Sequence, residues 1–228
     1  MIMPEVLKAR PVNVQVKHRA GFAPPRYDLF NIEVSASLAM KLAERFNLKS
    51  TGIIVNQNAS STNYISFRYF LPGEPVRFFD VSIGIDQAEI IFSNPATVPE
   101  LIQEIEKIWS LIFESLTPSL NDNYFEAAIH CDTDGASAKA FLNSVVTVQP
   151  NAPEMHKGFS VTNRTSDTVS KLSLDVSEPV PDGLYIAFAY VSRGRVTEMA
   201  SLVKLDDLAL ASYRSLQTVA QIELMEPN

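Results

Sequence analysis

The chain has 228 residues, of which 46% are hydrophobic and 20% are charged, a composition that supports a folded core and excludes a wholly disordered chain. Its formal net charge of −7 disfavours a nucleic-acid-binding protein, because phosphate backbones attract basic surfaces. No apolar run is long enough to cross a membrane and the first residues do not resemble a signal peptide, so we expect a soluble cytoplasmic protein.

The charge is distributed unevenly along the chain. The first 26 residues carry five cations and one acidic residue, a net charge of +4, so the remainder of the chain sums to −11. The cations are Lys8, Arg10, Lys17, Arg19 and Arg26. They indicate either an edge strand protected by its charges, or a basic arm that binds an acidic partner, including the acidic remainder of a second copy.

The first third of the chain predicts strands interrupted by a helix. Alternating apolar residues at 12–16 and the segment 27–34 have strand patterns. A helix is expected over 38–46, capped by Ser35 or Ser37 and ended by Asn47. Further strands separated by polar turns are expected at 52–56, 64–71, 76–85 and 88–92, with turns at 58–63, 72–75 and 86–87.

The clearest helix signal spans residues 97–116. Thr97 and Glu100 have the spacing of a capping box, and Pro99 falls in the first turn, where its missing N–H costs little. A buried apolar stripe is predicted at helical spacing: Leu101, Ile105, Ile108, Trp109, Ile112, Phe113 and Leu116. The Pro-, Ser- and Asn-containing segment that follows, 117–123, predicts a boundary between two halves of the chain.

The second half repeats these kinds of element. A strand at 124–131 leads into a helix at 136–146, and a final helix is expected from a cap at Asp206 or Asp207 to about Met225. Strands are also expected at 159–163, 172–176 and 184–191, with a loop at 149–158 and turns at 180–183 and 192–195. In the turn at 180–183, Gly183 is expected to accept a positive φ.

This order predicts an α+β fold made of two sheet-plus-helix halves of similar element order, 1–118 and 119–228, which can also combine into one composite domain. The turns are too short for parallel crossovers, so mainly antiparallel strands with helices on one face are expected. A sheet covered on one face leaves a face or an edge free, which favours self-association into a homodimer.

Two stretches carry a family resemblance. FDVSIGIDQAEIIFSNPATVPELIQEIEKIWSLIFESLTP runs from a hairpin into the Trp-bearing helix, and DGLYIAFAYVSRG precedes the last helix. Over most of its length the chain resembles a family of uncharacterised, sporadically distributed bacterial proteins, from which it departs at the strand EAAIHCD and in its opening segment. The resemblance implies a shared architecture and no particular activity.

The segment 127–141, AAIHCDTDGASAKAF, holds the densest set of reactive side chains. An apolar strand followed by D-x-D-G resembles the first motif of haloacid-dehalogenase-type phosphotransferases, which implies Asp132 as nucleophile and Asp134 as acid/base beside Mg²⁺. Lys204 and the pair Asp206–Asp207 are the candidate downstream cation and metal ligands.

Three features oppose that resemblance. First, only 94 residues follow Asp134, and they have hairpin patterns rather than alternating strands and helices. Second, the motif usually opens its domain, whereas here it lies past the middle of the chain. Third, Ala136 stands where the motif has Thr or Val. The simpler interpretation is that Asp132, Thr133 or Asp134 caps the following helix, since negative charge is favourable at a helix N-terminus.

Other reaction centres fit less well. A calcium loop would place glycine at position six and Glu at position twelve, whereas here glycine is at position four and Asn143 at twelve. His130 and Cys131 are adjacent on a strand and therefore point to opposite faces. Cys131 would need His18 or His156 nearby to become a nucleophile, so a buried structural thiol is expected.

Zinc and nucleotide signatures are lacking, since the single cysteine and three histidines form no local ligand pair and no glycine-rich phosphate loop occurs. The aromatic segment 64–70 with Arg68 is similar to nucleic-acid-binding sheets but lacks their partner motif, so a packed sheet face is expected.

The sequence therefore predicts a non-enzymatic binding or assembly protein that forms a homodimer and needs no cofactor or metal. The alternative is a Mg²⁺-dependent phosphatase-like hydrolase that uses Asp132 and Asp134. A minor alternative is a module that recruits an acidic partner through the basic N-terminal residues.

Overall fold

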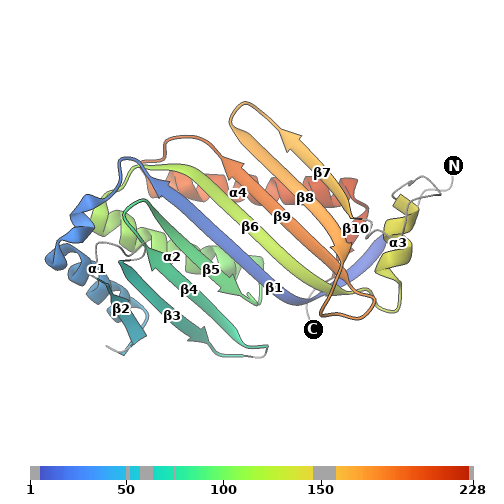
Figure 1. Ribbon diagram of the computed structural model, residues 1–228, viewed down its shortest axis with the longest axis horizontal. Helices are drawn as coiled ribbons and strands as arrows, with labels where there is room; N and C mark the ends of the chain where they lie inside the picture. The colour runs from blue at the N-terminus through green and yellow to red at the C-terminus, as the bar shows by residue number, and fades with distance from the viewer. Residues whose placement is uncertain (1–5, 50–51, 57–63, 74, 146–157, 226–228) are drawn as a thin grey trace. The chain divides into compact units, whose positions relative to one another are not determined.

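The computed structural model describes residues 6–49, 52–56, 64–73, 75–145 and 158–225 (Figure 1). Within them, ten strands form one sheet accompanied by four α-helices, so the predicted α+β class is confirmed. The strands are β1 (Leu7–Phe22), β2 (Ile53–Val55), β3 (Ile65–Leu71), β4 (Arg77–Ile83), β5 (Gln87–Ser93), β6 (Leu120–Asp132), β7 (Phe159–Arg164), β8 (Thr168–Val176), β9 (Leu184–Ser192) and β10 (Ile222–Leu224). The helices are α1 (Ile32–Arg45), α2 (Val98–Leu116), α3 (Ala138–Val145) and α4 (Met199–Val219), with a 3₁₀ turn η1 (Tyr27–Phe30).

The strand order is β2-β3-β4-β5-β1-β6-β9-β8-β7, and β10 pairs with β1. The pairs β2–β3, β3–β4, β4–β5 and β7–β8 are antiparallel, as expected from their short turns, whereas β10 runs parallel to β1. The predicted turn at 58–63 and all of the predicted loop at 149–158 except Gly158, including His156, lie outside the described residues.

The chain divides into two compact units, each assembled from separate segments. Unit 1 comprises Met1–Gln15, Glu126–Tyr190 and Leu208–Asn228, and unit 2 comprises Val16–Phe125 and Val191–Asp207. Four elements, β1, β6, β9 and α4, contribute residues to both units. The predicted division into the halves 1–118 and 119–228 stays a prediction.

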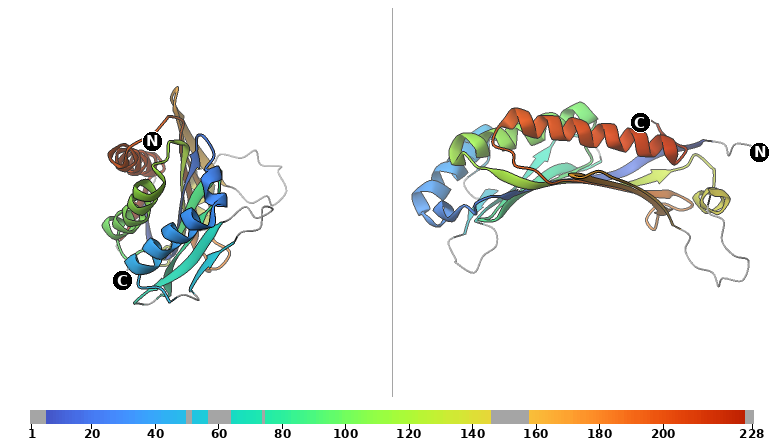
Figure 2. Two further views of the ribbon diagram at one scale, coloured as in Figure 1. Left: turned by 90° about the vertical axis from the view of Figure 1, so that its left-hand side faces the viewer. Right: turned by 90° about the horizontal axis from the view of Figure 1, so that it is seen from above.

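Unit 2 places α1 and α2 on one face of its strands (Figure 2). The predicted cap of α2 is confirmed, because Thr97 accepts a hydrogen bond from the Glu100 backbone N–H at 3.2 Å. The reciprocal bond of a capping box differs, since the Glu100 carboxylate accepts from Ala96 N–H at 2.7 Å rather than from Thr97 N–H. The predicted stripe is buried except at half-buried Phe113. Burial of this stripe against the strands is what holds the helix in place.

The prediction of a strand at 27–34 is wrong. Residues 27–30 form η1, and α1 begins at Ile32, six residues before the predicted start, because the Asn31 side chain accepts a hydrogen bond from Glu33 N–H and caps the helix. Ser35, a predicted cap, is buried in the first turn. Asn47 ends the helix as predicted, with a φ of 48°.

The prediction that β1 is an edge strand is also wrong. It lies between β5 and β6, in the interior of the sheet. Its second half buries Val16, His18, Ala20 and Phe22 on the helix-covered face, so every second residue is part of the core. Charge density alone does not distinguish an edge strand from a central strand whose other face is exposed.

The last helix differs from its prediction at both ends. α4 begins at Met199, so Asp206 lies inside the helix and is buried rather than capping it. The helix ends at Val219, and Ile222–Leu224 instead forms β10, which pairs with Leu7–Ala9. Backbone hydrogen bonds to a strand from the other end of the chain override the local helical periodicity.

Unit 1 has a core of strand residues facing one side. Cys131 on β6, Leu172 on β8 and Phe188 on β9 are buried, and the Phe188 ring meets Tyr213 of α4 edge-to-face at 5.2 Å. The turn at 180–183 is confirmed, but Asp182 carries its positive φ of 52°. Gly183 is needed for a close approach instead, because a Cβ there would lie 2.5 Å from the Cys131 carbonyl oxygen.

Candidate functional site

The D-x-D-G segment is a tight turn between β6 and α3. The Asp132 carboxylate accepts a hydrogen bond from Asp134 N–H at 3.0 Å, and Asp134 and Gly135 have φ values of 53° and 85°. α3 is capped by Ser137, which accepts from Ala140 N–H at 3.3 Å, so the helix cap lies beyond the three residues considered from sequence. Asp132 therefore orders the turn rather than the helix terminus.

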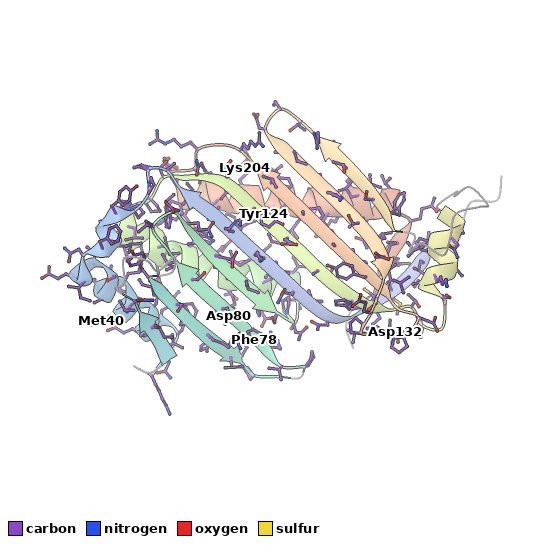
Figure 3. All side chains as sticks on the ribbon, in the orientation of Figure 1. Met40, Phe78, Asp80, Tyr124, Asp132 and Lys204 are labelled. Atoms are coloured by element: carbon purple, nitrogen blue, oxygen red, sulfur yellow. The ribbon has the colours of Figure 1, made fainter. Side chains whose placement is uncertain are left out.

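Both aspartates of this turn are exposed (Figure 3 labels Asp132). They belong to unit 1, whereas Lys204, Asp206 and Asp207 belong to unit 2, so the proposed phosphatase set is not assembled within one unit. Among the residues that the structure describes, no three His, Cys, Asp or Glu side chains are grouped so that they could hold a metal ion. Catalysis by Asp132 and Asp134 stays a prediction.

His130 and Cys131 point to opposite faces of β6, as strand geometry requires. Cys131 is fully buried, and desolvation raises the pKa of its thiol to about 12, which keeps it protonated and a weak nucleophile. His130 lies on the other face, where its Nδ1 is 3.0 Å from the Ser177 hydroxyl and its ring lies 4.8 Å from that of Tyr185. The two side chains are thus separated by the strand.

Three buried side chains of unit 2, those of Trp109, His18 and Asp206, form a cluster that the sequence did not predict, and we call it the polar cluster. Trp109 Nε1–H on α2 donates to His18 Nδ1 at 2.7 Å, and His18 Nε2 lies 3.7 Å from Asp206 Oδ1 on α4. Because Nδ1 accepts the indole proton, His18 is the neutral Nε2–H tautomer. One signal was available: His18 alternates with Val16 and Ala20, which places a polar ring on an apolar face.

Burial controls the protonation of His18 and Asp206, the two titratable members of the polar cluster. His18 is 1% exposed, and desolvation lowers the pKa of its imidazole to about 4. Desolvation also raises the pKa of Asp206 to about 7, with smaller contributions from the charges of Glu106 and Asp207. Both shifts favour neutral groups, as expected where water is excluded. The polar cluster is enclosed by core side chains, so its role is structural.

The five predicted partner-binding cations occupy fixed positions on and near β1. Lys17 lies 4.0 Å from Glu89, the Arg19 guanidinium lies over the Tyr124 ring at 4.9 Å from its centre, and Arg26 pairs with Asp28. The two others are exposed Lys8 and half-buried Arg10. The cations therefore belong to a sheet strand and the segment after it, and recruitment of an acidic partner through them stays a prediction.

The face of the unit 2 sheet opposite α1 and α2 is a mixed aromatic and charged surface, which we call the outer face. Register places Phe70 opposite Phe78 and Arg68 opposite Asp80, so these four side chains share that face. The outer face consists of Lys17, Arg19, Arg68, Phe70, Phe78, Asp80, Glu89, Ile91 and Tyr124. Figure 3 labels three of them, Phe78, Asp80 and Tyr124.

Arg68 is held at two points on the outer face. Its Nε and Nη2 donate to the two Asp80 carboxylate oxygens at 2.6 and 2.7 Å, and its guanidinium lies 4.4 Å from the centre of the Phe78 ring. Phe70 lies beside Phe78, with ring centres 5.8 Å apart, and remains 60% exposed. The prediction that segment 64–70 forms a packed sheet face holds for Ile65 and Phe67, which are buried, but not for Arg68 and Phe70.

The fold and the outer face define an α+β protein that presents an ordered aromatic and charged strand surface. None of its described helices is both long enough and apolar enough to cross a membrane. No protein-family model matches the chain, and no curated protein matches it closely enough to be a relative. Its relation to the bacterial family that it resembles stays a prediction.

Proposed function

We propose that the protein is a non-enzymatic assembly protein that binds a second copy of itself through the outer face. The observation that carries the proposal is the arrangement of Arg68, which is fixed between Asp80 and Phe78 beside the exposed ring of Phe70. The free thiol of Cys131 accords with a reducing compartment, and the resemblance is to bacterial proteins, so a bacterial cytoplasm is part of the proposal.

The composition of the outer face supports binding. Arginine and aromatic side chains contribute most of the binding energy in protein interfaces, because they bury a large area with few rotatable bonds. Arg68 has already lost its rotational freedom to its two contacts, so ordering it in a complex costs little further entropy. Phe70 offers the apolar area that would be removed from water.

The charges of the outer face favour a second copy over an unrelated partner. The face carries three cations, Lys17, Arg19 and Arg68, and two carboxylates, Asp80 and Glu89. The chain has a net charge of −7, whereas the five charges of the outer face sum to +1, so this face does not share the acidic excess that opposes association of two copies. Adjacent charges of both signs are also what a twofold interface needs, because the same surface must complement itself.

Sedimentation velocity over a concentration series tests the proposal. The wild type is expected to dimerise, and Phe70→Glu should raise the dissociation constant at least about tenfold, because it places a charge on the apolar centre of the interface. Met40→Glu is the matched control, since Met40 is 64% exposed and belongs to α1 (labelled in Figure 3), which lies on the face of the sheet opposite the outer face (Figure 2).

Two outcomes would contradict the proposal. A wild type that stays monomeric at all concentrations would exclude self-assembly. A dimer that survives Phe70→Glu but dissociates with Met40→Glu would exclude the outer face. Circular dichroism of both variants shows whether either substitution unfolds the chain.

A further inference from the structure

A second surface feature of unit 2 lies on the helix-covered side of the strands. A cavity of about 370 Å³ opens where the end of α1, the end of β3 and the middle of α2 meet. Its lining is Arg45, Phe46, Tyr69, Leu71, Glu104 and Lys107. This volume is within the range of small-molecule sites in proteins, roughly 300–1,000 Å³.

The floor of the cavity is apolar and fixed by packing. Phe46 is buried, and its ring centre lies 5.6 Å from that of Tyr69. Tyr69 in turn lies 5.1 Å from Phe79 in the core, so one edge of the ring is anchored while the residue remains half-buried. Such a floor can accept an aromatic or aliphatic group without rearrangement.

Among the described residues, the rim of the cavity carries one positive charge that has no ion-pair partner. Lys107 Nζ donates to Glu104 at 2.6 Å, so these two charges offset each other. Arg45, the last residue of α1, is exposed and makes no hydrogen bond or ion pair with the described residues. The Tyr69 hydroxyl likewise has no hydrogen-bond partner among the described part of the chain.

We infer that this cavity binds a small monocarboxylate with an apolar body. A guanidinium presents paired N–H donors that match a carboxylate, and the Tyr69 hydroxyl adds a third donor. The apolar floor formed by Phe46 and Leu71 receives the body of the ligand. The volume of about 370 Å³ lies near the lower end of the range for small-molecule sites, which favours a small ligand such as an arylalkanoate.

The probe for this site is 3-phenylpropionate, compared with its neutral amide 3-phenylpropionamide, titrated into the full chain and followed by NMR. We expect saturable binding of the carboxylate in the millimolar range and binding of the amide weaker by about tenfold, because only the carboxylate engages the Arg45 charge. Carboxylate binding that does not saturate by about 20 mM, or equal binding of the two probes, would overturn the inference.

Substitutions assign the binding to the cavity. Arg45→Gln should weaken carboxylate binding about tenfold and remove the preference over the amide, and Tyr69→Phe should weaken it by about fivefold while preserving the ring. Arg164→Gln removes an exposed arginine from β7 in unit 1 and should change nothing. Full affinity in Arg45→Gln would overturn the site. The inference is independent of self-assembly, since Phe70→Glu leaves the cavity intact.

Discussion

The two faces of the unit 2 sheet differ in how far their polar side chains are exposed to water. On the inner face, His18 and Asp206 are buried at 3.7 Å, and desolvation moves the pKa of each toward its neutral form. On the outer face, Arg68 and Asp80 make two short hydrogen bonds while their side chains stay 52% and 32% exposed.

Exposure to water explains why the two polar pairs behave differently. Where water is excluded, the desolvation cost of charging His18 or Asp206 exceeds the attraction between the two charges. Asp206 therefore stays protonated to a higher pH than in the unfolded chain, and the stability of the fold depends on pH. Where water remains, each charge is solvated and the pair contributes little to stability but stays available for contacts with another molecule. Alternation along the same strands separates the two roles.

The largest expected effect comes from the neighbours Phe78 and Phe79 on β4. Phe79→Ala should lower the free energy of unfolding by about 3–5 kcal/mol, because its fully buried ring contacts four other aromatic residues. Phe78→Ala on the outer face should cost only about 1 kcal/mol. Urea denaturation at low protein concentration measures both. Equal losses would mean that the outer face is covered in solution.

A smaller effect is expected from the pH dependence of Asp206. Its folded pKa of about 7 exceeds its unfolded value, so the folded state keeps a proton that the unfolded state loses, and stability falls as the pH rises toward 7. In Asp206→Asn that loss is absent. The stability of the variant relative to the wild type should therefore increase by about 2 kcal/mol between about pH 5 and about pH 8.

Urea denaturation at the two pH values measures this change. Glu44→Gln is the control, because it removes an exposed carboxylate of α1 that does not contribute to the pKa shift of Asp206. Burial lowers the pKa of His18 and gives an opposite slope below about pH 6.5. Asp206→Asn retains that burial, so most of the His18 contribution cancels in the difference, and the interval from about pH 6.5 to about pH 8 is nearly free of it. A difference that does not depend on pH would mean that Asp206 titrates normally in the folded chain.

The smallest effect is expected from the Arg68–Asp80 pair. A double-mutant cycle with Arg68→Gln and Asp80→Asn should give a coupling well below the Asp206 effect, because both side chains are open to solvent. Raising the salt concentration should remove most of that coupling. A large, salt-insensitive coupling would show that the pair is desolvated and that the two faces are less different than described.

Elements with strong local signals were predictable. Three features occur where their sequence patterns indicate: the helix cap at Thr97, the stripe that includes Ile105 and Trp109, and the hairpin between β4 and β5. Local capping chemistry and the periodicity of apolar residues are sufficient there, because each element satisfies its own backbone and buries its own stripe.

The candidate sites were less predictable. The D-x-D-G spacing of Asp132 and Asp134 suits a tight turn as much as a phosphotransferase motif, and the structure has the turn. Sequence spacing does not show which distant groups lie near these aspartates. The sequence showed that segment 64–70 combines aromatic residues with Arg68, but this segment was expected to form a packed sheet face. Its exposure depends on which face the helices cover, and nothing in segment 64–70 itself states that.

Local geometry in the sequence is sufficient to predict the α+β class, the capped helix after Thr97 and the opposite orientations of His130 and Cys131. Long-range contacts are what make charged β1 a central strand, bury Asp206 beside His18 and turn residues 222–224 into β10. These outcomes depend on partners far away in the chain, whose burial and hydrogen bonds outweigh the small energies of local preference.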